Sequence, residues 1–167
     1  MPRCPSLRPP PADAARHARA LAFARQVVVL NGSFMFSADL VRHFVPAHVL
    51  DFVKVSSYEG TESTGKVKLS TPPSTDMRGK DVILIEDIVD TGGTIEFLRQ
   101  HFLEELGAGS VATCTLLEKP ARREVDIPVE YVGFSVPDLF VIGYGLDFNQ
   151  RYRSLPYIGI LKPEMYQ

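Results

Sequence analysis

The strongest constraint on the fold lies in residues 82–94, which read VILIEDIVDTGGT. Four consecutive apolar residues, 82–85, predict a central parallel strand that is covered on both faces. The acids Glu86 and Asp87 then end this predicted strand, and Gly92 and Gly93 mark a turn before a helix expected over 94–106. This order of strand, polar glycine loop and helix indicates a ligand site at the edge of an α/β sheet.

The rest of the chain repeats the alternation of strands and helices. Because of this alternation we predict an α/β fold, with a mainly parallel central sheet flanked by helices. The polar stretch 56–76, rich in Ser, Thr and Gly, predicts a mobile functional loop. Apolar residues at helical spacing predict a helix over 34–44. Further strands are expected over 27–30, 49–55, 111–117, 131–134 and 140–144.

Composition bounds the classes of protein to consider. The 167 residues fit one domain, and 45% hydrophobic with 23% charged residues is typical of a globular protein. The net charge of −2 argues against a nucleic-acid partner, and no apolar run approaches the ~20 residues that span a membrane. Two scattered cysteines favour a reducing, cytoplasmic location. We therefore expect neither nucleic acid nor membrane as a partner.

The first 25 residues differ from the rest, because they are rich in Pro, Ala and Arg and nearly free of acids. We predict a boundary here, with a divergent segment over 1–25 and the main domain over 26–167. Disorder followed by a surface helix is one interpretation of the segment. A divergent start, an incomplete gene model and an organelle transit segment are the others.

The loop that follows the central strand combines groups that suit a phosphate. Gly92 and Gly93 leave backbone N–H groups accessible, and Thr91 and Thr94 add hydroxyls. The positive end of the following helix favours an anion at the same place. The loop lacks the Gly-Lys-Ser/Thr ending of a P-loop, so a P-loop nucleotide hydrolase is not expected.

Three acids beside this loop would repel a bare anion, so the ligand must also present hydroxyl groups or a metal cation. Glu86 and Asp87 can accept hydrogen bonds from a ribose diol or hold Mg²⁺, and Asp90 can accept a substrate proton. The structural alternative is that Glu86 and Asp87 merely end a strand while Asp90 or Thr91 caps the helix.

Residues 82–94 resemble the signature of type I phosphoribosyltransferases. The resemblance implies that Glu86 and Asp87 bind the ribose hydroxyls of phosphoribosyl diphosphate. It also implies that the loop after them binds the 5′-phosphate, through Ile88, Thr91, Gly92, Gly93 and Thr94.

Other segments resemble the hypoxanthine-guanine branch of this family. Residues 30–34 resemble its pyrophosphate loop, with Asn31 where lysine is common, Gly32 next to it, and a cis peptide implied at Leu30–Asn31. Ser57 and Tyr58 resemble the start of its mobile lid. Later residues match its purine and metal positions: Lys119, Phe140, Asp147 and Arg153, each with a structural alternative in a loop, core, turn or surface, and Val141, whose backbone is implied to read the base edge.

The resemblance implies a glycosyltransferase of purine salvage, which joins a 6-oxopurine base to the phosphoribosyl group with Mg²⁺. Asp90 is the implied general base, Tyr58 closes the lid, and Asp147 joins Glu86 and Asp87 in binding metal. A homodimer or homotetramer and a small hood formed by the chain termini are also implied. A phosphoribosyl-diphosphate-binding regulator and a xanthine-preferring enzyme are the alternatives.

Overall fold

The computed structural model describes residues 25–43, 48–57 and 67–165. The prediction of a divergent segment over 1–25 lies almost wholly outside these residues, as does any part of it in a hood. Tyr58 also lies outside them. These predictions therefore remain predictions.

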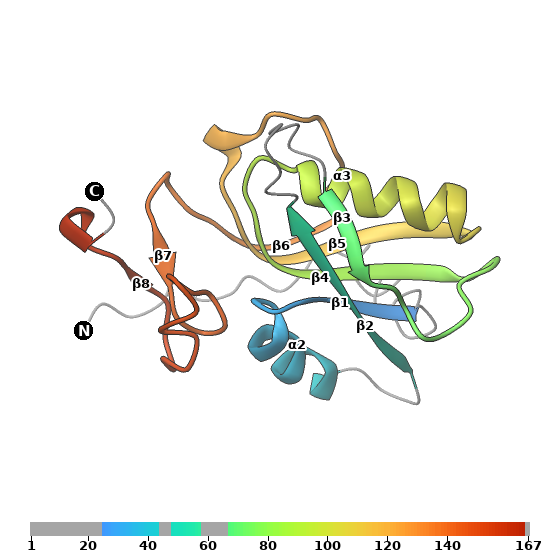
Figure 1. Ribbon diagram of the computed structural model, residues 1–167, viewed down its shortest axis with the longest axis horizontal. Coiled ribbons are helices and arrows are strands. Elements are labelled where there is room, and N and C mark those ends of the chain that lie inside the picture. The colour runs from blue at the N-terminus through green and yellow to red at the C-terminus, as the bar shows by residue number, and fades with distance from the viewer. Residues whose placement is uncertain (1–24, 44–47, 58–66, 166–167) are drawn as a thin grey trace, which may run out of the picture.

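A six-stranded sheet forms the body of the molecule, in the order β3-β2-β1-β4-β5-β6 (Figure 1). Neighbouring strands are parallel except at one edge, where β3 runs antiparallel to β2. The predicted class, an α/β fold with a mainly parallel sheet, is confirmed. The strands are β1 (Arg25–Leu30), β2 (Val49–Ser57), β3 (Val67–Thr71), β4 (Asp81–Val89), β5 (Ser110–Glu118) and β6 (Tyr131–Ser135).

Two helices cover opposite faces of the sheet, as Figure 1 shows. Helix α2 (Phe34–Leu40) continues into a 3₁₀ turn (Val41–His43), and α3 (Gly93–Gln100) continues into a π turn (His101–Glu105). Alternate side chains of a strand point to the same face, which places Val27 and Val29 in one core with residues of α3 and the turn after it. The α3 side of that core consists of Ile95, Leu98 and Phe102, all at most 1% exposed.

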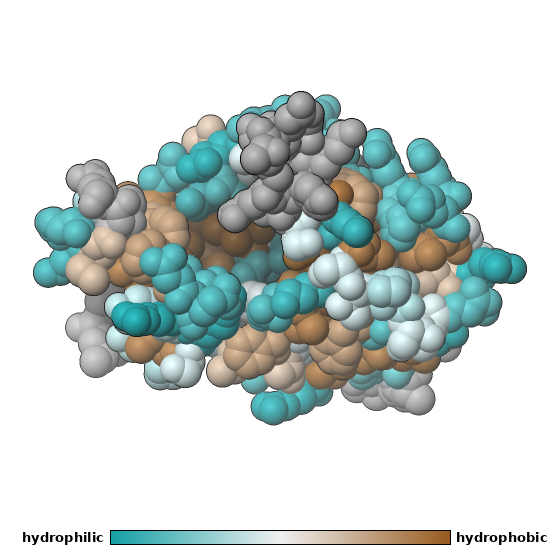
Figure 2. All heavy atoms as spheres, viewed as in Figure 1, coloured by the Kyte–Doolittle hydropathy of each residue, from teal (hydrophilic) through white to brown (hydrophobic). Residues whose placement is uncertain are grey.

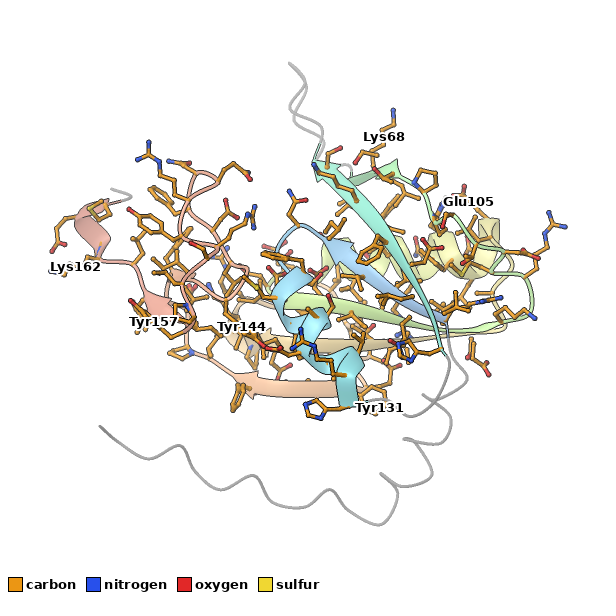
Figure 3. The ribbon with its side chains drawn as sticks, turned by 90° about the horizontal axis from the view of Figure 1, so that it is seen from below. Lys68, Glu105, Tyr131, Tyr144, Tyr157 and Lys162 are labelled. Carbon is orange, nitrogen blue, oxygen red and sulfur yellow. The ribbon has the colours of Figure 1, made fainter. Side chains whose placement is uncertain are left out.

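The chain after β6 forms a small lobe beside the sheet, built on β7 (Val141–Ile142) and β8 (Gly159–Ile160). Tyr157 and Lys162 project from this lobe, at the opposite end of the molecule from Glu105 (Figure 3). The Tyr144 hydroxyl donates a hydrogen bond of 2.5 Å to Asp39 on α2. Burial and this carboxylate raise the pKa of Tyr144 to about 12, so the contact ties the lobe to α2 as a neutral donor.

The structure corrects three of the predicted element boundaries. Strand β4 does not end at its two acids but runs on to Val89, because the ladder with β5 continues through Ile88 and Val89. The stretch 56–76 is not all loop, since β3 lies within it and pairs with β2. The strand predicted over 140–144 is reduced to β7, and its partner β8 was not predicted.

Candidate functional site

A cavity of about 310 Å³ opens at the carboxyl ends of β1 and β4. The chain continues from β1 to β2 on one side, while β4 lies on the other, so the strand order reverses here. Such switch points are where open α/β sheets bind ligands. Figure 2 shows the molecule hollowed between the C-terminal lobe and the sheet. Of the predicted site residues, the cavity is lined by Asn31, Gly32, Glu86, Asp87, Ile88, Asp90, Thr91, Gly92, Thr94, Asp147 and Arg153.

The two acids on β4 lie in different environments although they are adjacent. Glu86 is only 7% exposed. Its burial, and next the negative charge of Asp87, raise the pKa of Glu86 well above its ordinary value. Asp87 is less buried, and its Oδ1 accepts a hydrogen bond from the N–H of Ile88 at 2.9 Å. The pair therefore favours a ligand that brings hydroxyl donors or positive charge.

The loop after β1 packs directly against Asp87. The Leu30–Asn31 peptide bond is cis, as the resemblance implied. A Cβ added to Gly32 would lie 1.6 Å from Asp87 Oδ2, so only glycine allows this approach. The Ser33 hydroxyl donates a hydrogen bond to the carbonyl of Val29 and fixes the loop from within. The backbone of Asn31 and Gly32 thereby lines the cavity next to the Asp87 carboxylate.

The glycine loop leads into α3 as predicted, but without a side-chain cap. Gly92 occupies the N-cap position with φ of 97°, a left-handed conformation that favours glycine. Neither Asp90 nor Thr91 caps the helix, so the structural alternative for these two residues is wrong. Both residues line the cavity.

The C-terminal lobe supplies the facing wall. Arg153 lies 2.9 Å from Asp147 Oδ1, and its guanidinium also donates to the carbonyl of Gly145 at 2.8 Å. A Cβ on Gly145 would lie 1.9 Å from the carbonyl oxygen of Gly32. The lobe thus meets the loop after β1 backbone to backbone, and an acid and an arginine face the acids of β4.

Lys119, Phe140 and Val141 lie outside the set that lines this cavity. Lys119 follows β5, is 7% exposed, and places its ammonium 3.9 Å from Asp90 Oδ2. Phe140 is 36% exposed and contacts Phe148 edge to face, with ring centroids 5.5 Å apart. Val141 begins β7 and packs on the cluster around Leu117. We call Lys119, Phe140 and Val141 the annex; of these, Lys119 contacts Asp90.

The remaining predicted residues are Gly93, Ser57 and Tyr58. Gly93 begins α3, behind the residues that line the cavity. Ser57 ends β2, and Tyr58 lies outside the described residues, so the predicted lid stays a prediction.

Two charged residues beside the site were missed. Arg122 places its Nε 2.8 Å from Asp90 Oδ1, and Asp138 Oδ1 lies 3.5 Å from the Lys119 ammonium. Arg122 lies in the turn after β5, outside the quoted motifs, and Asp138 lies in the segment 137–149 that resembles the family's purine and metal segment but was not singled out there. The one available signal was their position shortly after Lys119 and shortly before Phe140.

The donor set of the cavity suits a hard divalent cation. Glu86, Asp87 and Asp147 offer carboxylate oxygens, which Mg²⁺ prefers. Within the described residues, no three His, Cys, Asp or Glu side chains cluster closely enough to hold a metal ion. Mg²⁺ commonly binds through one or two carboxylates together with substrate phosphates, so these residues fit such an ion. Separately, no helix in the described part of the chain is long and apolar enough to cross a membrane.

Fold and cavity together define an α/β protein with a polar cavity at the switch point of its sheet. A family model described as phosphoribosyl transferase domain matches residues 25–149, and the chain belongs to this family of transferases. Its predicted membership of the family is thereby confirmed.

Relatives of known name agree with this placement. A hypoxanthine phosphoribosyltransferase of Salmonella typhimurium is 53% identical over 134 residues, which cover 80% of this chain and 75% of the relative. A hypoxanthine-guanine phosphoribosyltransferase of Bacillus subtilis is 46% identical over 87% of this chain and 81% of its own. A crystal structure of a hypoxanthine phosphoribosyltransferase from Staphylococcus aureus matches with a TM-score of 0.81 at 43% identity, covering 92% and 84% of the two chains.

Proposed function

We propose that this chain transfers the 5-phosphoribosyl group from phosphoribosyl diphosphate to hypoxanthine or guanine. The products are IMP or GMP and diphosphate, which makes the chain a purine salvage enzyme. The observation that carries the proposal is that one cavity joins the acids of β4, the glycine loop and the Asp147–Arg153 wall. The names of the relatives above support the choice of base.

The ribose and its phosphates occupy the cavity in this proposal. Glu86 and Asp87 accept hydrogen bonds from the ribose hydroxyls. The backbone from Ile88 to Thr94, with the hydroxyls of Thr91 and Thr94, binds the 5′-phosphate at the start of α3. The diphosphate lies against Asn31 and Gly32, and Arg153 offsets part of its charge.

The base occupies the annex beside Asp90. Lys119 donates to the purine carbonyl oxygen, Phe140 stacks on the ring, and the backbone at Val141 reads the ring edge. A purine nitrogen attacks the anomeric carbon, the bond from that carbon to the diphosphate oxygen breaks, and Asp90 accepts the N7 proton of the base. The position of Asp90, between the cavity and Lys119, supports this role.

Mg²⁺ is the proposed cofactor, with Glu86, Asp87 and Asp147 as the residues that would hold it, directly or through water. When bound it would neutralise charge on the leaving diphosphate. Ser57 and Tyr58 begin the segment that we propose closes over the substrates and excludes water.

A panel of bases tests the proposed function. With phosphoribosyl diphosphate and Mg²⁺, the purified chain should release diphosphate when given hypoxanthine or guanine. Binding of phosphoribosyl diphosphate without turnover of any purine would instead favour a regulator. Preference for xanthine would identify a related enzyme with another base, and adenine serves as the negative control.

We also propose a homodimer or homotetramer in the cytoplasm. The sheet ends at β6, where Val132 and Phe134 are 38% and 46% exposed, and an exposed apolar edge strand suits contact with a second copy. Light scattering of the purified chain measures the mass directly, and a monomer would contradict the proposal. A fluorescent fusion tests the location, and accumulation in an organelle would contradict a cytoplasmic one.

A further inference from the structure

Four charged side chains form a ring where the cavity meets the annex. Arg122 Nε lies 2.8 Å from Asp90 Oδ1, and Lys119 Nζ lies 3.9 Å from Asp90 Oδ2. Both cations also reach Asp138 Oδ1, at 3.5 Å each. Asp90 and Lys119, the proposed general base and base-reading lysine, thus each have a second partner that the proposed reaction does not use.

The backbone fixes where Arg122 lies relative to Asp90. The 3₁₀ turn Pro120–Arg122 follows β5 directly. The N–H of Lys119 donates to the carbonyl of Val89 at 3.0 Å, and the N–H groups of Glu124 and Val125 both donate to the carbonyl of Thr91, at 3.0 and 3.3 Å. The acceptors of these bonds, Val89 and Thr91, are the residues directly before and after Asp90. The turn that carries Arg122 is therefore hydrogen-bonded to the loop that carries Asp90.

The contact between Arg122 and Asp90 is close but poorly aligned. Asp90 Oδ1 is buried and receives no hydrogen bond from the described residues, although Arg122 Nε is within 2.8 Å. Arg122 attracts the carboxylate by charge without occupying the oxygen with a well-directed N–H. Because Oδ1 is buried against Arg122, Oδ2 is the Asp90 oxygen that is left to meet a proton from a substrate.

Asp90 and Lys119 carry opposite charges and face one another without a hydrogen-bonded contact. If Asp90 and Lys119 formed a hydrogen bond with each other, the proton acceptor and the purine-reading donor would no longer be available to the base. Arg122 attracts Asp90 from one side, and Asp138 attracts Lys119 from the other. Asp90 and Lys119 therefore stay at an ion-pair distance of 3.9 Å and do not close to a hydrogen bond.

We propose that Arg122 is a positioning residue that keeps Asp90 apart from Lys119 and oriented to receive the proton of the base. The proposal rests on the proposed function, since it gives Arg122 a role only through Asp90. It predicts that loss of Arg122 lowers kcat rather than the affinity for phosphoribosyl diphosphate. A lysine at the same place, which retains the charge, should restore most of the rate.

The test compares Arg122→Ala, Arg122→Gln and Arg122→Lys in steady-state assays with hypoxanthine. We expect kcat to fall about 10- to 100-fold in the alanine and glutamine variants, the scale of a misplaced catalytic group. KM for phosphoribosyl diphosphate should stay near the wild-type value, and Arg122→Lys should recover most of kcat. Arg78→Ala, at an exposed arginine just before β4, is the matched control. Thermal melting identifies any variant that fails to fold, and the glutamine variant then replaces the alanine one.

A double-mutant cycle with Asp90→Asn decides the mechanism. If Arg122 acts through Asp90, removing Arg122 should have little further effect on kcat once Asp90 is changed. A full loss of rate in the Asp90→Asn background, or an effect on KM alone, would overturn the inference. Absence of turnover by the wild-type chain would instead overturn the proposed function, so the two failures are distinguishable.

Discussion

The two halves of the site are built in different ways. The proposed phosphoribosyl half comprises Gly32 and residues 86–94, which come from one strand-loop-helix unit and the loop packed against it. The proposed base half comprises Lys119, which follows β5 and contacts Asp90, and the adjacent Phe140 and Val141 at the start of β7. Backbone geometry fixes most of the first half, which the Asp147–Arg153 ion pair of the C-terminal lobe faces, whereas ion pairs and packing between distant segments fix the second. We therefore expect substitutions in the first half to change mainly KM for phosphoribosyl diphosphate, and substitutions in the second half to change mainly the kinetics with hypoxanthine.

The largest expected effect lies at Asp90, where the halves meet. Asp90→Asn should lower kcat by about 10²- to 10⁴-fold, because the amide retains the size of the side chain but cannot accept the proton. Binding of phosphoribosyl diphosphate, measured by titration calorimetry, should change little. Asp126→Asn, at an exposed aspartate, is the control. An unchanged kcat would remove the general-base role and leave the halves without a shared residue.

A smaller loss is expected at Lys119, which tests the base half alone. Lys119→Ala should lower kcat/KM for hypoxanthine by about 10- to 100-fold, since a hydrogen bond to a charged donor contributes roughly 1.5–3 kcal/mol. The same assay with Lys80→Ala, at an exposed lysine before β4, should match the wild type. Equal kcat/KM for hypoxanthine before and after Lys119→Ala would show that this contact is not made.

The matching test of the phosphoribosyl half is Gly32→Ala. The added Cβ would lie 1.6 Å from Asp87 Oδ2, so the carboxylate must move away from the ribose. We expect KM for phosphoribosyl diphosphate to rise by about tenfold, equal to about 1.4 kcal/mol of lost binding, with a smaller change in KM for hypoxanthine. At Gly159 an added Cβ meets Tyr157 at an ordinary 3.6 Å, which makes Gly159→Ala the control. A rise in KM for hypoxanthine alone would contradict the division into halves.

The smallest effect on catalysis is expected at Asp51, which belongs to neither half. Asp51 is 4% exposed and accepts hydrogen bonds from Ser74 and Thr75, which join β2 to the segment between β3 and β4. Asp51→Asn turns an amide donor toward these donors and should cost about 1–3 kcal/mol of unfolding free energy. Denaturant unfolding measures this loss, and kcat should remain at the wild-type value.

The pH dependence of this loss gives a second check. Burial raises the pKa of Asp51, but the hydrogen bonds from Thr75, Ser74 and Phe52 together outweigh it, so the pKa lies below its ordinary value. In acid the unfolded chain then binds more protons than the folded one, and stability falls as pH falls. The stabilisation is present above the ordinary value of 3.8 and is lost as pH drops through the folded pKa. The difference in unfolding free energy between wild type and Asp51→Asn should shrink as pH falls over that range. A difference that stays constant would contradict the pKa shift.

The same division explains what could be predicted from the sequence. The acids of β4 and the glycine loop are contiguous, so their residue types and order alone predicted a ligand site that the cavity brings together. Strand β3 was missed because its alternation, V-K-L-S, is short and lies within a stretch otherwise rich in Ser, Thr and Gly, and because its partner β2 lies on the other side of segment 58–66. Arg122 and Asp138 were missed because their partners, Asp90 and Lys119, become neighbours only when the turn after β5 docks on the loop after β4.

The contact between Gly145 and the loop after β1 bears on the order in which the site is made. Chains grow from the N-terminus, so the loop with Gly32 and the acids of β4 leave the ribosome before Gly145, Asp147 and Arg153. A nascent chain that ends before these residues carries the acids and the glycine loop without their facing wall. Under the proposed function, the complete site for phosphoribosyl diphosphate is therefore formed only late in translation, when the C-terminal lobe closes the cavity.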